Sequence, residues 1–271
     1  MGARMSDIDA AIAAIARGQH ALFTVEQGRS VGMTRGQMRS RLSARRWELV
    51  HPGVLRITGT PLTWQGRALA ACLTTPSGIA SHLTAAHLWG LDGFGPVGRI
   101  DVTVPRHHRP PDRSGIRYHE SLAYDLADVR KRQGVPVAGP SRTALDVCGC
   151  VDDFRGLGAL DEIRRLRLAT WPVLWECLIL HAVRGRNGID RYRRILEKRY
   201  GRSVAANDFA RLVERLLEDA GLPEPVHELG VLACGHRYRI DLAYPDLLIA
   251  IELIVHGAAW LEFGLGLRRF R

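Results

Sequence analysis

Apolar positions recur every three or four residues in the amino-terminal part of the chain, and this spacing predicts helices. Ile8, Ile12 and Ile15 lie on one side of a first helix, which we expect to end near Gly18. Two more helices follow, and each is preceded by a threonine that can cap its first turn. They cover residues 25–30 and a stretch from Arg35 to about Trp47.

Two short β runs come after these helices. They cover residues 48–51 and 54–58, and Pro52 with Gly53 between them predicts a tight turn. Three helices and a hairpin in this order are typical of a winged helix-turn-helix. We therefore predict such a DNA-binding domain over residues 1–61.

Helices alternate with strands over residues 62–200, and the pattern predicts a mixed α/β middle domain. The expected helices cover residues 64–73, 81–89 and 141–148, and the expected strands cover residues 100–104 and 116–119. Residues 105–111 form a proline-broken basic loop, which we expect to add a phosphate contact. His107 and His108 in this loop could bind a metal, or could be solvated, as adjacent loop histidines usually are.

The carboxy-terminal part carries two acids on a second predicted hairpin. Residues 238–244 and 248–252 are β-rich runs that meet at a turn containing Pro245, which can place Asp241 and Glu252 side by side. Two carboxylates and a neighbouring backbone carbonyl suit Mg²⁺, which can activate water against a phosphodiester. An ordinary hairpin with one acid at each end is the other interpretation.

The composition indicates the class of partner. With 46% hydrophobic and 24% charged residues, the 271-residue chain belongs to the soluble globular class. Its formal charge is +10, and Lys131 and Lys198 are the only lysines. Arginine binds phosphate through a planar pair of donors, so this balance favours a nucleic-acid partner.

The amino terminus and the apolar runs indicate where in the cell we expect the protein. Asp7 and Asp9 lie in the first helix, unlike the start of a signal peptide. The longest apolar run, residues 171–183, is interrupted by Glu176 and is too short to cross a bilayer. Five scattered cysteines form no disulfide framework. We therefore expect a cytoplasmic protein that binds no membrane.

The third predicted helix offers a face for the DNA major groove. At about 100° per residue, Met38 and Leu42 fall on the core side, and a small polar face flanked by arginines falls opposite. Gln37 and Ser40 are expected to touch base edges, while the arginines hold phosphates. The predicted DNA-binding residues are Arg35, Gln37, Arg39, Ser40, Arg41, Arg45 and, from the hairpin, Arg56. The other interpretation is a solvated basic helix in a winged domain that binds protein.

Further segments carry a family resemblance. They are residues 32–35, the hairpin residues 53–57, the run Ala-Ser-His-Leu-Thr-Ala-Ala-His-Leu-Trp-Gly-Leu over 80–91, and Pro-Ser-Arg-Thr-Ala-Leu-Asp over 140–146. Over roughly residues 7–185 the chain resembles the AbiEi-type antitoxin family of type IV toxin-antitoxin systems. The resemblance implies a transcriptional repressor that binds its own promoter, with a nucleotidyltransferase toxin as partner.

Ser81, His82 and Asp146 lie in these segments and could suggest a hydrolase. No nucleophile elbow or evident oxyanion site accompanies them, so we interpret them as structural residues. Arg142 and Asp146 are four residues apart, and we expect them to form a pair on the surface of a helix.

Residues 207–252 resemble the restriction-endonuclease-like fold with its PD-(D/E)xK signature, and specifically the very-short-patch-repair endonucleases. In this resemblance Asp241 matches the central metal-binding aspartate, and Glu252 matches the acid of an E-x-D-G element. Ile254 stands where the family has an aspartate, and the residues after it resemble none of the family's remaining helix and strands. We therefore expect a truncated, inactive nuclease core over residues 201–271.

These patterns together predict an α+β multidomain protein, with a winged helix-turn-helix over 1–61, a mixed α/β middle domain over 62–200 and an incomplete restriction-endonuclease-like α/β domain over 201–271. The leading hypothesis is a DNA-binding transcriptional regulator of the AbiEi type, which binds double-stranded DNA without a cofactor and has a nucleotidyltransferase toxin as partner. The alternative is a Mg²⁺-dependent DNA endonuclease, targeted by the winged helix, with Asp241 and Glu252 as its catalytic and metal-binding residues. A third hypothesis is an antitoxin that works by covering its toxin.

Overall fold

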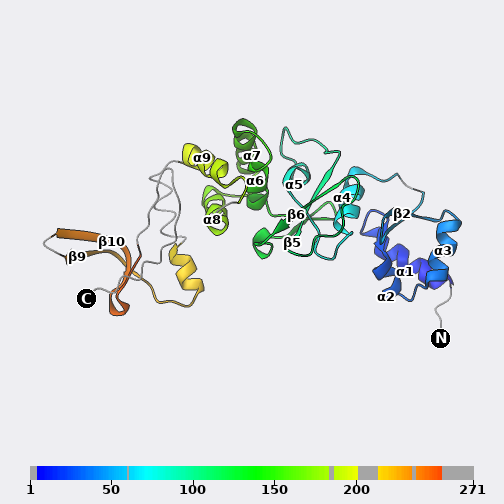
Figure 1. The fold of residues 1–271 in the computed structure, drawn as a ribbon, viewed down its shortest axis with the longest axis horizontal. Helices are drawn as coiled ribbons and strands as arrows, with labels where there is room; N and C mark the ends of the chain where they lie inside the picture. Colours follow the sequence, from blue (N-terminus) through cyan, green and yellow to red (C-terminus); the bar gives the residue numbers. More distant parts are fainter. Residues whose placement is uncertain (1–4, 60, 183–185, 201–212, 234–235, 252–271) are drawn as a thin grey trace. The chain divides into compact units, whose positions relative to one another are not determined.

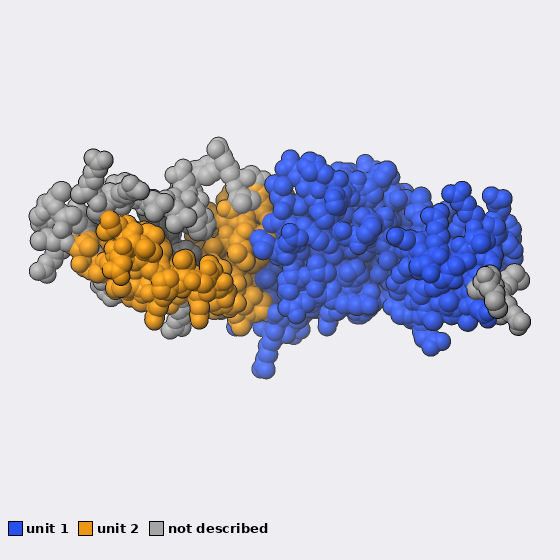
Figure 2. Space-filling model, turned by 90° about the horizontal axis from the view of Figure 1, so that it is seen from below, with its two compact units in different colours: residues 1–168 blue, residues 169–271 orange. Residues whose placement is uncertain are grey.

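The computed structural model has a mixed α/β fold (Figure 1), and it describes residues 5–59, 61–182, 186–200, 213–233 and 236–251. The chain divides into two compact units, residues 1–168 and residues 169–271 (Figure 2). The border between the units differs from the domain borders predicted after residues 61 and 200. The three domains therefore stay a prediction.

The first unit begins with three helices and a small sheet. The elements are α1 (Met5–Arg17), β1 (Leu22–Thr24), α2 (Val25–Ser30), α3 (Arg35–Ser43), β2 (Trp47–His51) and β3 (Val54–Ile57). The strands lie in the order β1-β3-β2, and both pairings are antiparallel. The predicted helices and hairpin are present, and β1 is an additional strand. Helix α3 ends earlier than predicted, because Arg45 takes a φ of 52° and Trp47 already belongs to β2.

One apolar core joins these elements. Ile8 and Ile12 of α1 are buried in it, together with side chains from the three strands and from the turn before α3. Met38 and Leu42 of α3 pack against this core, as predicted. Helical periodicity thus identified the apolar side chains of α1 and α3 that face the core.

A five-stranded sheet with helices makes up the rest of the first unit. The elements are α4 (Trp64–Cys72), β4 (Ile79–Ala80), α5 (His82–Trp89), β5 (Ile100–Pro105), β6 (Ile116–Ser121), η1 (Asp125–Ala127), β7 (Arg130–Arg132), β8 (Val135–Val137), α6 (Pro140–Cys148) and α7 (Asp153–Arg165). The strand order is β6-β5-β4-β8-β7. β5 pairs with β6, and β4 with β8, in parallel, whereas the β4/β5 and β7/β8 pairings are antiparallel. The predicted helices and the strands β5 and β6 are confirmed.

The second unit contains helices and a three-stranded sheet. Its elements are α8 (Trp171–His181), α9 (Ile189–Tyr200), helical residues 213–219, β9 (Val226–Ala233), β10 (His236–Tyr244), η2 (Pro245–Leu247) and β11 (Ile249–Ile251). The sheet is antiparallel with the order β11-β10-β9. The β10–β11 hairpin is the one predicted around Pro245. Among the described helices, none is long and apolar enough to span a bilayer.

Candidate nucleic-acid interface

The outer surface of α3 is polar and basic. Arg35, Arg39 and Ser40 are exposed on it, and Arg45 is exposed just after the helix ends. No acidic residue lies in the first turn of α3. These four residues lie where the sequence pattern predicted a DNA-binding surface, and a polyanion could reach each of them.

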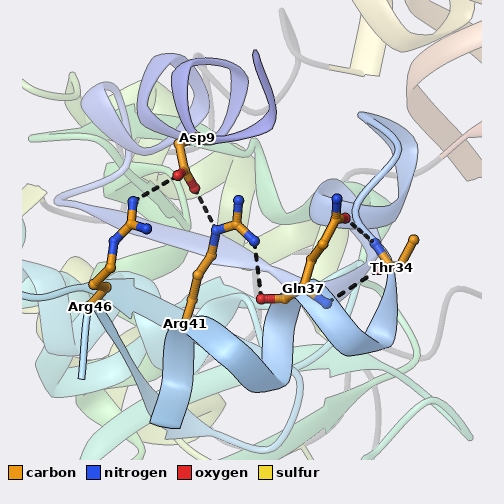
Figure 3. A network of polar contacts seen from close by, with 5 residues as sticks. All are labelled: Asp9, Thr34, Gln37, Arg41 and Arg46. Carbon is orange, nitrogen blue, oxygen red and sulfur yellow. Dashed lines mark hydrogen bonds and ion pairs between the residues drawn. The ribbon is translucent and has the colours of Figure 1, made fainter. Parts of the chain in front are cut away.

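The start of α3 is held by a reciprocal pair of hydrogen bonds. The Thr34 hydroxyl accepts from the backbone N–H of Gln37 at 3.2 Å, and the Gln37 side-chain oxygen accepts from the backbone N–H of Thr34 at 2.9 Å (Figure 3). This capping box satisfies two backbone donors that the helix itself leaves unpaired. It also commits the oxygen of Gln37, so the predicted base contact of this residue would rely on its amide nitrogen.

The prediction that Arg41 is a phosphate contact is wrong, because this side chain is only 2% exposed. Its Nε donates to an Asp9 carboxylate oxygen at 2.5 Å, and one terminal nitrogen donates to the Gln37 carbonyl at 3.1 Å (Figure 3). The guanidinium carbon lies 5.1 Å from the centre of the Trp47 ring. The acid that draws Arg41 inward comes from α1, and helical spacing within α3 could not reveal it.

Asp9 binds a second arginine as well. A terminal nitrogen of Arg46, whose side chain is 54% exposed, donates to the other Asp9 oxygen at 2.7 Å. Burial opposes the charge on Asp9, but the hydrogen bonds and charges of Arg41 and Arg46 outweigh this effect and hold the pKa of the carboxyl below its usual value. Asp9 and Arg46 were not among the predicted site residues.

Arg56 does not project from the hairpin as predicted. It lies opposite Glu48 in the β2/β3 pairing, and the two side chains form an ion pair at 2.6 Å. The Arg56 side chain is only 12% exposed. A cross-strand pair of opposite charges explains this placement, because directly opposite residues in an antiparallel pair bring their side chains together.

A second cluster of polar side chains lies at the five-stranded sheet. Asp101 of β5 is buried, and its carboxylate accepts from His119 of β6 at 2.9 Å. The rings of His119 and His82 are stacked with their centres 3.6 Å apart. Burial lowers the pKa of His82 to about 4, so its imidazole is neutral at pH 7. Ser81 contacts His82 at 2.9 Å but is fully buried, which removes it from any substrate.

The predicted pair between Arg142 and Asp146 is present, but it is buried rather than exposed at the surface. Arg142 Nε donates to Asp146 at 2.8 Å, but the two side chains are only 4% and 6% exposed. Arg142 also donates to the Ala123 carbonyl at 3.2 Å. The predicted spacing on one helix face was correct, but that face of α6 is covered, so the pair is part of the interior.

Residues 77–198 match the AbiEi antitoxin C-terminal domain family. The match to this AbiEi model includes the five-stranded sheet, the His82–His119 stack and the buried Arg142–Asp146 pair. It leaves out α1 to α3 and the sheet of the second unit. The crystal structure of the RV2827C protein from Mycobacterium tuberculosis resembles the chain with a TM-score of 0.44 and 14% identity, over 84% of this chain and 89% of that one. No curated protein matches the sequence significantly.

The predicted nuclease site is described only in part. Asp241 lies in β10 and is half-buried, and Leu242 beside it pairs with Ile251 of β11. Glu252, Ile254 and the predicted tail lie outside the described residues. Within the described ranges, no group of three or more His, Cys, Asp or Glu side chains is arranged to hold a metal. The pairing of Asp241 with Glu252 therefore stays a prediction.

Proposed function

We propose that this protein is a DNA-binding transcriptional regulator of the AbiEi antitoxin type, and that α3 enters the DNA major groove. The observation that carries the proposal is the exposed surface of α3. Arg35 and Arg39 supply positive charge there, and Ser40 adds a small hydrogen-bonding group directly after Arg39. Arginines can bind phosphates or guanine edges, and a short polar side chain lets the helix approach the bases.

The order of the surrounding elements supports a winged helix-turn-helix. Helices α2 and α3 are joined by a short turn, and β2 and β3 form a hairpin directly after α3. In this fold the second helix of the pair reads the groove, and the hairpin lies beside it. Because Arg56 is paired with Glu48, the proposed interface consists of Arg35, Gln37, Arg39, Ser40 and Arg45, without Arg41 or Arg56.

The AbiEi match supports the regulatory part of the proposal. Residues 77–198 match the family's antitoxin domain, and an antitoxin implies a toxin. The resemblance noted in the sequence makes a nucleotidyltransferase the expected toxin. Double-stranded DNA is the second expected partner, and no cofactor is expected for binding it.

Binding of the whole protein to its own upstream DNA tests the proposal. Affinity should be measured by fluorescence anisotropy for the upstream duplex and for a scrambled duplex of equal length, at two salt concentrations. We expect tighter binding to the upstream duplex and weaker binding to both at high salt, because phosphate contacts release counterions. Equal, weak affinity for the two duplexes would contradict the proposal.

For the carboxy-terminal hairpin we propose an inactive remnant of a nuclease. Incubation of supercoiled DNA with the protein and Mg²⁺ should leave the DNA uncut. Cleavage by the wild type that is lost in Asp241→Ala would instead support the endonuclease hypothesis, in which Asp241 and Glu252 hold the metal.

A further inference from the structure

An acid from α1 contacts the helix that we propose for DNA binding. Asp9 receives one hydrogen bond from Arg41 inside α3 and another from Arg46, which follows the helix. By charge alone, an aspartate beside a DNA-binding helix weakens the attraction of phosphates. Its presence there calls for a physical reason other than attraction of DNA.

The reason lies in the burial of Arg41. A guanidinium with 2% exposure has lost nearly all of its water, and leaving such a charge unpaired is strongly unfavourable. Asp9 supplies the opposite charge, and it comes from α1, 32 positions earlier in the chain. The ion pair therefore connects two helices, whereas the capping box acts within α3 alone.

Three contacts in different directions fix the plane of the Arg41 guanidinium. Asp9 accepts from Nε, the Gln37 carbonyl accepts from a terminal nitrogen, and the guanidinium carbon lies over the Trp47 ring, 5.1 Å from its centre. A planar group held in this way cannot rotate without losing at least one contact. Because Arg41 extends from the middle of α3, its fixed position also limits the rotation of α3 about its own axis.

We infer that Asp9 and Arg41 are positioning residues, which set the rotation of α3 and so the direction in which Arg39 and Ser40 point. The inference rests on the proposed DNA binding. It has an unusual consequence, because replacing Asp9 with asparagine raises the net charge by one and yet should reduce the selectivity for the correct DNA sequence. If only the charge mattered, Asp9→Asn would bind both duplexes more tightly, and its selectivity would be unchanged.

The test compares Asp9→Asn with Glu26→Gln in the full-length protein. Glu26 is exposed on α2, so its replacement changes the charge equally without touching Arg41. Affinities for the upstream and the scrambled duplex should be measured at one salt concentration, well below the unfolding temperature of each variant. We expect Glu26→Gln to bind both duplexes more tightly with an unchanged ratio. Asp9→Asn should lower the ratio at least about tenfold, as expected when one base contact is lost.

Three further variants keep the test decisive if Asp9→Asn does not fold. Asp9→Glu keeps the charge and should retain most of the selectivity. Arg41→Lys keeps the charge of α3 but loses the planar fork, and it should lose selectivity as Asp9→Asn does. Arg46→Gln removes only the exposed ion pair with Asp9 and should leave the ratio of the two affinities unchanged.

The outcomes separate this inference from the proposed function. If the wild type does not distinguish the two duplexes, the proposed function fails. If the wild type distinguishes them, but Asp9→Asn behaves like Glu26→Gln or Arg41→Lys keeps the full ratio, then DNA reading stands and the positioning role is wrong.

Discussion

Two buried arginine–aspartate pairs lie in the first unit, and they differ in how the chain brings their members together. Arg142 and Asp146 are four residues apart on α6, and both are almost fully buried. Arg41 and Asp9 come from two helices, and Asp9 remains 26% exposed and binds Arg46 as well. The first pair is made within one helix, whereas the second fixes two helices to each other. The same kind of ion pair thus stabilises the interior at Arg142 and Asp146, whereas at Arg41 and Asp9 it orients α3.

The largest expected effect on stability concerns Arg142 and Asp146, the pair in which both side chains are buried. Arg142→Leu removes the guanidinium that pairs with the buried carboxylate of Asp146, which should reduce the free energy of unfolding by about 3–5 kcal/mol. Arg165→Leu is the matched control, because Arg165 also pairs along its helix, with Glu162, but is 58% exposed. It should lose far less stability than Arg142→Leu, because water screens an exposed ion pair. Urea unfolding measures both losses, and similar small values would mean that burial does not distinguish the pairs.

Stability should depend on pH differently at His82 and at the Asp9 ion pairs. The pKa of His82 is about 4 in the folded chain and 6.5 in an exposed histidine, so the unfolded chain takes up a proton that the folded chain refuses. The groups around it are Asp146, His119, Asp101 and Arg142. Stability is therefore complete at pH 7 and falls as the pH drops below about 6.5, by about 2 kcal/mol at pH 4.5.

Urea unfolding at pH 7 and pH 4.5 checks this expectation in the wild type and in His82→Gln, which lacks the titrating group. An equal loss in both proteins would remove His82 as the cause. The Asp9 network should not contribute over this range. The pKa of Asp9 is held below 3.8, so its stabilising charge is lost only in stronger acid.

A smaller effect on stability is expected at the capping box that begins α3. Thr34→Ala removes the hydroxyl that accepts from the Gln37 N–H, and it should cost about 1 kcal/mol of unfolding free energy. Ser43→Ala, at the exposed last residue of α3, is the control and should change little. Thermal unfolding measures the difference. A Thr34→Ala protein as stable as the control would show that the cap is dispensable.

The smallest stability effect is expected at the exposed surface. Arg39→Gln should change the free energy of unfolding by no more than about 0.5 kcal/mol, because no buried group depends on it. The same variant should reduce the salt dependence of DNA binding by a slope of about 0.9, corresponding to one phosphate contact. A titration over several salt concentrations would detect this, and an unchanged slope would remove Arg39 from the interface.

The sequence predicted helices α1 to α6 and the β10–β11 hairpin, but it missed several short strands and the eight-residue β9. Ile8, Ile12, Met38 and Leu42 show helical spacing, and each packs in or against the core as expected. Strands β1, β4, β7 and β8 have three residues or fewer. A strand this short shows no reliable alternation, and only pairing with distant strands defines it.

The candidate interface was predictable where side chains face outward and not where they meet a distant partner. The exposure of Ser40 followed from its angle on α3, opposite Met38 and Leu42. Arg41 lies near the border of the core face, and its burial depends on Asp9 from another helix. For Arg142 the spacing to Asp146 was visible, but the covering of α6 by the rest of the fold was not.

The capping box of α3 also bears on the order in which this region folds. It uses Thr34 and Gln37 alone, so it can form as soon as those residues are synthesised. The contact between Asp9 and Arg41 closes a much longer loop, which carries a larger entropic cost and is slower to form. During folding, α3 can therefore acquire its first turn early, while its direction is settled only when α1 docks.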